Sequence, residues 1–281
     1  MQSTRLRLAS LALVAALGTY AAAIPAGFAE TAKDAANDPW PDVARDAFNR
    51  RPLEDGGAFL SIEMPYRAED AAIVPVVMRT TLPPADGRSV KALTLVIDEN
   101  PAPVAATFTL GANSGTAMIA TRVRVDAYTN VHAVAELSDG KLYAVKTYVK
   151  ASGGCSAPAS KNADEAQARL GEVRFRQIAQ ADAVPASRMR QAQIMVRHPN
   201  NSGLQMDQVS RLYTPASFVQ SLKVWQGDDI VLSMEGGISI SEDPNISFTF
   251  LPNGAASFRV EARDTDNRVF KGEWPASRSA M

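Results

Sequence analysis

The sequence contains a single cysteine, Cys155, and only two histidines, His132 and His198, among its 281 residues. One cysteine excludes an intramolecular disulfide, and so few cysteines and histidines exclude the clustered ligands of a zinc site. The 29 lysines and arginines nearly balance the 30 aspartates and glutamates, leaving a formal net charge of −1. Without a basic stripe, neither a nucleic acid nor an anionic membrane is expected as a partner.

The motifs of most enzyme classes are also missing. There is no Gly-x-Ser-x-Gly elbow, phosphate loop or dinucleotide fingerprint, and Gly153-Gly154 lacks the strand-to-helix spacing of the latter. The nine methionines do not cluster as copper ligands. We therefore expect no metal and no cofactor. One catalytic alternative stays open, a cysteine hydrolase in which His132 assists Cys155, but both histidines are otherwise expected to be structural.

Long apolar runs are confined to the start of the chain. Arg5 and Arg7 precede an apolar run from Leu8 to Leu17, and small residues follow up to Ala29. This order predicts a secretory signal peptide over residues 1–29. The alternative is an uncleaved membrane anchor, which favours about 20 strongly apolar residues. The second part of this segment is instead rich in alanine and is broken by glycine and proline.

The first half of the mature chain is predicted to be a leader followed by a β-sandwich. Residues 30–57 are expected to form the leader, with a short helix from Asp42 to Phe48 that Asp42 caps. Residues 58–150 alternate apolar and polar side chains in short runs separated by turn residues, which is typical of an immunoglobulin-like sandwich. Asp139-Gly140 predicts a hairpin. The expected strands are 59–62, 73–78, 90–97, 104–110, 121–126, 129–137 and 141–150.

The second half is predicted to be another β-sandwich, over residues 173–281. Gly227-Asp228 and Asn253-Gly254 are turn signals that each predict a hairpin. The expected strands begin near 173 and include 189–197, 218–225, 230–234, 246–251, 256–262 and 269–274. The fold class is therefore all-β, with two immunoglobulin-like sandwiches joined by an arm rich in glycine, serine and alanine and by a short helix.

The connection between the halves, residues 151–172, carries the cysteine. It begins with small residues around Cys155 and ends in a predicted helix from Asn162 to Gly171. Because small residues bury little surface, Gly153, Gly154 and Ser156 are expected to form a flexible arm that exposes the thiol. Such an arm reaches on the order of 20 Å. A plain linker that happens to contain a cysteine is the alternative.

Motifs in both halves resemble the bacterial sulfur-oxidation proteins SoxY and SoxZ. The SoxY-like motifs are Ile73-Val74-Pro75-Val76, Asn100-Pro101-Ala102-Pro103, Thr121-Arg122, Val131-His132-Ala133-Val134-Ala135, Asp139-Gly140-Lys141 and the run from Lys146 to Cys155. The SoxZ-like motifs are Val196-Arg197-His198-Pro199, Ser202-Gly203-Leu204, Pro215-Ala216-Ser217-Phe218-Val219 and Ile240-Ser241-Glu242-Asp243-Pro244. The chain thus resembles a SoxY–SoxZ fusion, similar to the SoxYZ-like carriers associated with quinoprotein dehydrogenases.

This resemblance implies a periplasmic carrier without catalytic turnover. Cys155 would hold a small, sulfur-containing group covalently, with Gly153 and Gly154 as the hinge and the SoxZ-like half as the scaffold. The implied partners are periplasmic redox enzymes, either a c-type cytochrome or a quinoprotein dehydrogenase. The chain departs from SoxY where Ser156-Ala157-Pro158 replaces the trailing glycines of a free terminus. The alternative is a non-catalytic adaptor of a periplasmic quinoprotein dehydrogenase, without covalent cargo.

Overall fold

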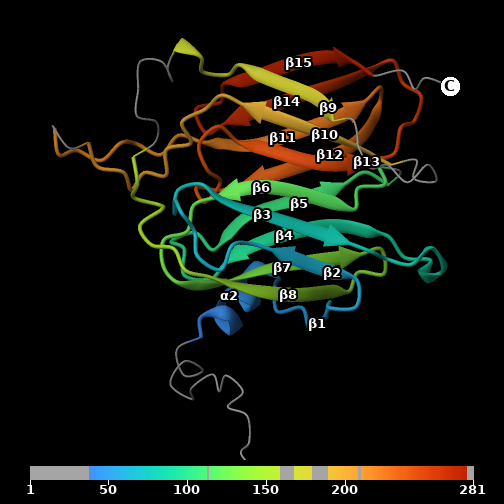
Figure 1. The fold of residues 1–281 in the computed structure, drawn as a ribbon, viewed down its shortest axis with the longest axis horizontal. Helices are drawn as coiled ribbons and strands as arrows, with labels where there is room; N and C mark the ends of the chain where they lie inside the picture. Colours follow the sequence, from blue (N-terminus) through green and yellow to red (C-terminus); the bar gives the residue numbers. More distant parts are fainter. Residues whose placement is uncertain (1–37, 113, 159–167, 179–188, 208–209, 277–281) are drawn as a thin grey trace, which may run out of the picture. The chain divides into compact units, whose positions relative to one another are not determined.

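The regular secondary structure of the described part of the chain consists almost entirely of β-strands (Figure 1). The computed structural model describes residues 38–112, 114–158, 168–178, 189–207 and 210–276. The first half contains α2 (Trp40–Ala47), β1 (Leu53–Asp55), β2 (Leu60–Glu63), β3 (Val74–Thr80), η1 (Pro84–Asp86), β4 (Val90–Ile97), β5 (Val104–Leu110), β6 (Met118–Val123), β7 (Thr129–Leu137) and β8 (Leu142–Val149). The second half contains β9 (Val173–Ile178), β10 (Arg190–Val196), β11 (Val219–Gln226), β12 (Asp229–Gly236), β13 (Asn245–Phe250), β14 (Ser257–Asp264) and β15 (Val269–Pro275).

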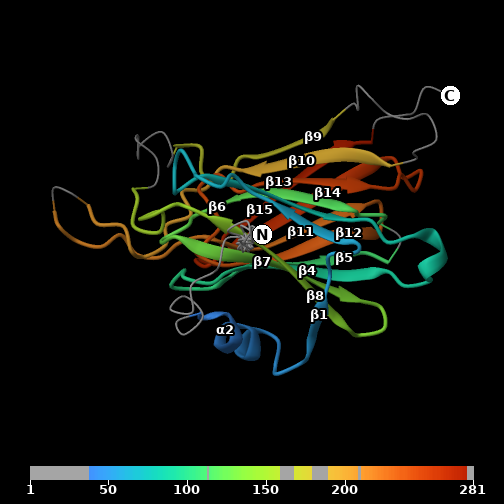
Figure 2. The same ribbon diagram turned by 60° about the horizontal axis from the view of Figure 1, so that its bottom comes forward.

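The strands form two sheets, and both sheets run through both halves of the chain (Figures 1 and 2). The nine-stranded sheet has the order β1-β8-β7-β4-β5-β12-β11-β14-β15, and the six-stranded sheet has the order β2-β3-β6-β13-β10-β9. The halves join where β5 pairs with β12 and β6 pairs with β13, both antiparallel. The predicted all-β, immunoglobulin-like sandwich fold is confirmed, and the sheets of its two halves are continuous.

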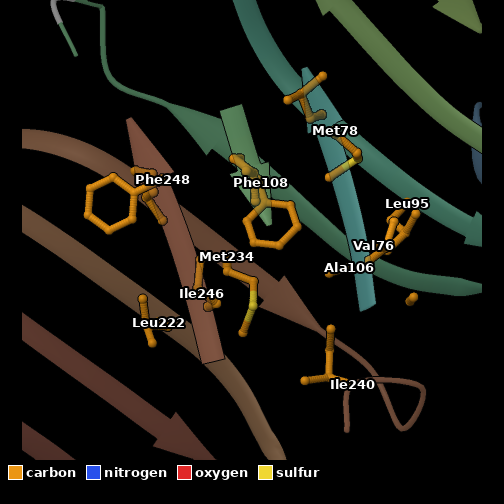
Figure 3. Close-up of a cluster of buried hydrophobic side chains, with 14 of the residues drawn as sticks. Val76, Met78, Leu95, Ala106, Phe108, Leu222, Met234, Ile240, Ile246 and Phe248 are labelled. Carbon is orange, nitrogen blue, oxygen red and sulfur yellow. The ribbon is translucent and has the colours of Figure 1, made fainter. Parts of the chain in front are cut away.

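The junction between the halves is filled with apolar side chains (Figure 3). Phe108 of β5 lies opposite Met234 of β12, and both are fully buried. Phe248 of β13 lies opposite Ile119 of β6 in the other sheet, also fully buried. Burying each such side chain stabilises the fold by about 1.5–3 kcal/mol. Neither half therefore completes its core without the other.

One of the predicted hairpins is wrong. Asp139-Gly140 does connect paired strands β7 and β8, with Gly140 at a φ of +80°, and Gly227-Asp228 connects β11 and β12. The strands around Asn253-Gly254, β13 and β14, belong instead to different sheets. Phe250 and Phe258 meet edge to face across the core, with ring centroids 5.0 Å apart. The chain therefore crosses from one sheet to the other here, because these aromatic residues pack between the layers.

The leader contains the predicted helix, but its cap differs. α2 begins at Trp40 after Pro39, and Asp42 lies in its first turn, where it pairs with Arg45 at 2.7 Å. Prolines favour the start of a helix because their φ is already helical, which moves the start ahead of Asp42. Most of the predicted helix 162–171 and the whole of the predicted signal peptide lie outside the described residues. No helix of the described ranges is long and apolar enough to cross a membrane.

Candidate functional site

The segment around Cys155 is held against the loop that follows β6. Gly153 N donates to the carbonyl of Asp126 at 2.8 Å, and Gly154 N donates to that of Val125 at 3.0 Å. A turn then closes where Ala157 N donates to the carbonyl of Gly153 at 3.0 Å. In this conformation Gly153 and Gly154 are hydrogen-bonded into the turn, and the flexibility of the arm stays a prediction. The small residues allow backbone pairing with the β6 loop, which composition alone does not reveal.

Gly154 and Gly153 are needed for two different reasons. A Cβ at Gly154 would lie 2.0 Å from the carbonyl oxygen of Ala71 and 2.6 Å from that of Val125, so only glycine allows this close approach. Gly153 has open space around it but a φ of +77°, which favours glycine. Ser156 is exposed, and its hydroxyl donates to the carbonyl of Gly153 at 3.2 Å. The glycine pair thus allows the backbone to form this turn.

Cys155 itself is fully buried, at 0% exposure, which overturns the prediction of an exposed thiol. Its N–H donates to Oδ1 of Asp126 at 3.2 Å, and its carbonyl accepts from the hydroxyl of Ser202 at 2.5 Å. Burial, together with the nearby Asp126 carboxylate, raises the pKa of the Cys155 thiol to about 12, although the Arg124 cation opposes this. Near neutral pH the thiol in this closed conformation is protonated and unreactive.

Arg124 lies beside the turn and is also fully buried. Its guanidinium donates to the carbonyls of Gly154 at 3.1 Å, Ala157 at 3.5 Å and Asn200 at 3.5 Å. The alternation of polar and apolar residues over 121–126 predicts that one face of this strand is exposed to solvent. Arg122 and Arg124 both lie on that face. In the structure Arg124 is buried, and both the Cys155 turn and Asn200 of the second half lie against it. The local sequence pattern around Arg124 does not predict these contacts, because they come from distant parts of the chain.

The second half contributes directly to the site. Ser202 Oγ reaches the carbonyl of Cys155 and lies 3.0 Å from Oε1 of Gln205, which also accepts from Ser202 N at 2.8 Å. Ser202 lies within a SoxZ-like motif of the sequence, whereas Gln205 lies in none of the motifs given above. Asn100, also quoted only within a motif, is buried and orders the β6 loop. Its amide donates to the carbonyl of Arg124 at 2.8 Å and accepts from Asp126 N at 2.9 Å.

The two histidines pair with buried aspartates rather than with Cys155. His132 Nδ1 lies 3.0 Å from Oδ1 of Asp98, and its ring stacks on Trp40 with centroids 3.5 Å apart. Among the described contacts, neither histidine is hydrogen-bonded to Cys155, so the geometry offers no base for a cysteine hydrolase. Within the described ranges, no three His, Cys, Asp or Glu side chains gather closely enough to hold a metal ion.

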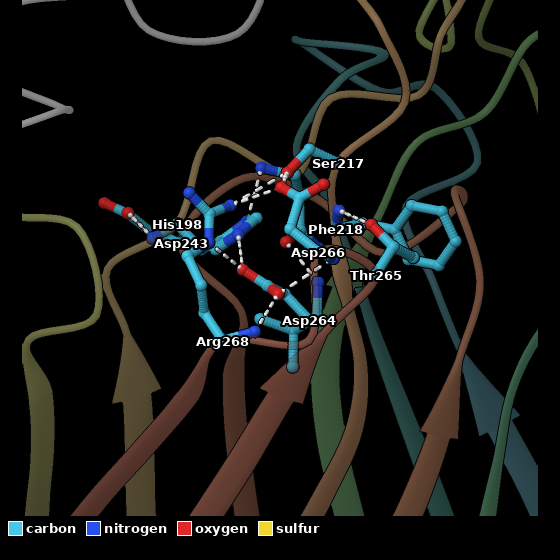
Figure 4. Close-up of polar contacts among 10 residues, drawn as sticks. His198, Ser217, Phe218, Asp243, Asp264, Thr265, Asp266 and Arg268 are labelled. Atoms are coloured by element: carbon cyan, nitrogen blue, oxygen red, sulfur yellow. Dashed lines mark hydrogen bonds and ion pairs between the residues drawn. The ribbon is translucent and has the colours of Figure 1, made fainter.

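His198 lies in a cluster of polar contacts in the second half, where it faces Asp264 (Figure 4). Its Nδ1 accepts from Asn200 N at 3.1 Å, so its Nε2 carries the proton and donates to Asp264 at 3.3 Å. Burial lowers the pKa of His198, and Asp264 offsets only part of this. The neutral imidazole thereby positions Asn200, whose carbonyl accepts from Arg124.

Raising the pH is expected to open the Cys155 turn. The closed thiol has a pKa of about 12, whereas an exposed thiol has a pKa of about 8.5. The closed state therefore keeps a proton that the open state loses above about pH 8.5, so each further pH unit favours opening by about tenfold. The rate of Cys155 alkylation by iodoacetamide should rise steadily from pH 7 to pH 10. The unfolded chain is the control, and its rate should be half-maximal near pH 8.5 and level off about one pH unit higher. The same plateau in the folded protein would contradict the closed site.

Comparison with known proteins accounts for both halves. Residues 44–155 match the sequence model of sulfur oxidation protein SoxY, and residues 178–275 match that of sulphur oxidation protein SoxZ. No curated protein matches the chain. Among solved structures, the sulfur carrier protein SoxY from Chlorobium limicola f thiosulfatophilum is 24% identical, with 40% of this chain and 91% of that chain covered and a TM-score of 0.33. A superoxide reductase (neelaredoxin) from Ignicoccus hospitalis is 11% identical, with 33% of this chain and 79% of that chain covered and a TM-score of 0.29.

Proposed function

The chain belongs to the sulfur-oxidation family as a fusion of a SoxY domain and a SoxZ domain, and from this membership we propose that it is a sulfur carrier. The observation that supports this most directly is the position of Cys155. It is the only cysteine of the chain, and it is the last residue of the SoxY match. We propose that its thiol is the covalent attachment site for a small, sulfur-containing group and that the protein has no catalytic turnover of its own.

Loading such a group requires partners. Joining the Cys155 thiol to the thiol of a reduced sulfur compound forms a sulfur–sulfur bond and releases two protons and two electrons. These two electrons need an acceptor, and we propose that a partner protein supplies it. The proposed partners are periplasmic redox enzymes, either a c-type cytochrome or a quinoprotein dehydrogenase. The apolar segment that predicts a signal peptide supports a periplasmic location.

The carrier is also proposed to alternate between a closed and an open conformation. A fully buried thiol is out of reach of a partner, so the turn must leave its position before loading or unloading. Opening breaks the hydrogen bonds that Asp126 and Ser202 make to Cys155 and those that Arg124 makes to the neighbouring carbonyls. The closed state protects the thiol from oxidation between these encounters.

A second candidate is a non-catalytic adaptor of a periplasmic quinoprotein dehydrogenase. The burial of Cys155 favours it, because a thiol with no exposed surface is also what a purely structural cysteine would show. The two candidates differ in what they require of the sulfur atom. A carrier fails without it, whereas an adaptor needs only the fold.

Replacing Cys155 by serine tests the proposal. Serine is close in size and keeps the backbone hydrogen bonds of the turn, so the fold should be preserved. Cells that depend on the protein for oxidising reduced sulfur are expected to lose that oxidation completely with Cys155→Ser and to keep it with the control Ser156→Ala. Sulfur consumption by the cells is the measurement. Full activity of Cys155→Ser would overturn the carrier and favour the adaptor.

A further inference from the structure

β15 forms an open edge of the nine-stranded sheet (Figure 1). It pairs with β14 along one side over seven residues without a bulge, and no strand of the described ranges pairs with its other side. The opposite edge of the same sheet, β1, has only three residues. Native proteins often shorten or bulge their edge strands, because free N–H and C=O groups otherwise pair with another chain. β15 has neither of these two devices, so it is a template for a further strand.

The register with β14 determines which backbone groups of β15 point outward. Ala276 N donates to the carbonyl of Ala256 at 2.8 Å, and hydrogen-bonded pairs alternate along an antiparallel ladder. The even-numbered residues of β15 therefore bond to β14. The N–H and C=O groups of Val269, Lys271 and Glu273 point away from β14, and none of the hydrogen bonds found among the described residues involves them.

The sequence of β15 is complementary to itself when two copies run antiparallel about Gly272. Lys271 of one copy then lies opposite Glu273 of the other, and their outward N–H and C=O groups can bond in both directions. Opposite charges at facing positions stabilise a strand pair, whereas like charges weaken it. The remaining facing pairs are apolar: Phe270 with Trp274, and Val269 with Pro275.

The side chains of this edge are accessible to a partner. The side chain of Lys271 is 65% exposed, although it already pairs with Glu261 of β14 at 2.9 Å. On the other face of the strand, Trp274 lines an open hollow of about 430 Å³. One end of the edge is less open, since the carbonyl of Pro275 accepts from Gln177 Nε2 at 3.1 Å. Pairing with a further strand therefore depends on the centre of β15.

We propose that two copies of this chain associate through β15, with a two-fold axis at Gly272 that joins their nine-stranded sheets into one. A lysine on an edge strand ordinarily discourages pairing. Here Lys271 meets Glu273 of the second copy on each side of the axis, so it favours this chain over strands without a matching glutamate. Such a pairing uses the same surface twice and closes at two copies. It involves an edge of the second half and does not depend on a group carried by Cys155.

Charge reversal tests the register of this pairing. Sedimentation equilibrium measures the dissociation constant of the dimer, with reductant present so that Cys155 cannot link two copies. The wild type is expected to dimerise as its concentration rises. Lys271→Glu and Glu273→Lys each place like charges opposite each other on both sides of the axis, so each should raise the dissociation constant about tenfold. The double variant Lys271→Glu/Glu273→Lys exchanges the two charges and should restore the wild-type value.

Lys223→Glu is the matched control. Lys223 is exposed on β11, an inner strand of the same sheet, and its reversal changes the net charge by the same amount as Lys271→Glu. The dissociation constant should stay at the wild-type value.

Hydrogen exchange in the wild type locates the interface without any variant. The amides of Lys271 and Glu273 should be protected in concentrated protein and should exchange freely in dilute protein. The amide of Gly272 bonds to β14 and should stay protected in both.

A protein that stays monomeric at every concentration would overturn the inference and leave this edge to a strand of another protein. A dimer in which the amides of Lys271 and Glu273 exchange freely would overturn it as well, because the interface would lie elsewhere. A folded double variant that dimerises no better than the single variants would contradict the register about Gly272. None of these measurements requires cargo on Cys155, so failure here is distinct from failure of the carrier proposal.

Discussion

Gly154→Ala is expected to raise the rate at which Cys155 reacts with iodoacetamide by up to about a hundredfold at pH 7.5, because overpacking of this kind costs about 1–3 kcal/mol. The added Cβ would lie 2.0 Å from the carbonyl oxygen of Ala71. A backbone oxygen cannot turn aside as a side chain does, so the turn must leave its position. The displaced thiol then returns to its ordinary pKa of about 8.5 and becomes reactive.

Gly57→Ala is the matched control for this substitution. Its added Cβ would meet nothing closer than 3.4 Å, and its φ does not require glycine. The alkylation rate of Cys155 should therefore stay at the wild-type value. Gly153→Ala should give a smaller increase than Gly154→Ala, because its φ of +77° is strained for alanine but no atom blocks the side chain. Equal rates in wild type and Gly154→Ala would mean that the turn does not protect the thiol.

Asp264→Ala is expected to lower the free energy of unfolding by about 2 kcal/mol, the scale for leaving buried hydrogen-bond donors without their acceptor. Asp264 is fully buried and accepts from Arg268 Nε at 2.6 Å and from His198 Nε2 at 3.3 Å (Figure 4). Burial raises the pKa of Asp264, but hydrogen bonds from Arg268 outweigh this and hold it below the ordinary range. Its stabilisation is therefore complete at neutral pH and is lost only as the pH falls through that lowered pKa.

Urea denaturation at pH 7 measures this effect, with Asp266→Ala as its control. Asp266 pairs with the same arginine, but its side chain is 51% exposed, so its loss should cost less than about 1 kcal/mol. Asp264→Ala should also loosen the Cys155 turn, since His198 positions Asn200 and the carbonyl of Asn200 accepts from Arg124. An unfolding free energy within about 0.5 kcal/mol of the wild type, the range of an ordinary surface substitution, would contradict the structural role of this cluster.

The strands could be predicted from the sequence because their signal is local. Val90–Ile97 and Val104–Leu110 have the predicted bounds, since alternation and turn residues within each segment determine them. The hairpin at Asn253-Gly254 was wrong because a turn signal does not say which sheet the next strand joins. The packing of Phe250 against Phe258 across the core accompanies the crossing of the chain to the other sheet.

The sequence singles out Cys155 as the candidate site residue, but it does not predict the environment of that residue. Cys155 stood out as the only cysteine at the end of a family motif, yet its burial depends on residues far away in the chain. Ser202 reaches its carbonyl from the second half, and Asp126 accepts from its N–H in the β6 loop. Asn200, also from the second half, accepts from the neighbouring Arg124. The glycines suggested mobility because composition does not distinguish a hinge from a close backbone approach. The contact of Gly154 with Ala71 is visible only in three dimensions.

The covalent attachment of cargo to Cys155 is tested most directly by the intact mass of the native protein. The protein is purified without reductant from cells that are actively oxidising sulfur, and its mass is measured before and after reduction. The proposal predicts an added mass that is located on Cys155 and removed by reductant, and its size would identify the class of cargo. A mass equal to that of the unmodified chain under these conditions would contradict the carrier and favour the adaptor.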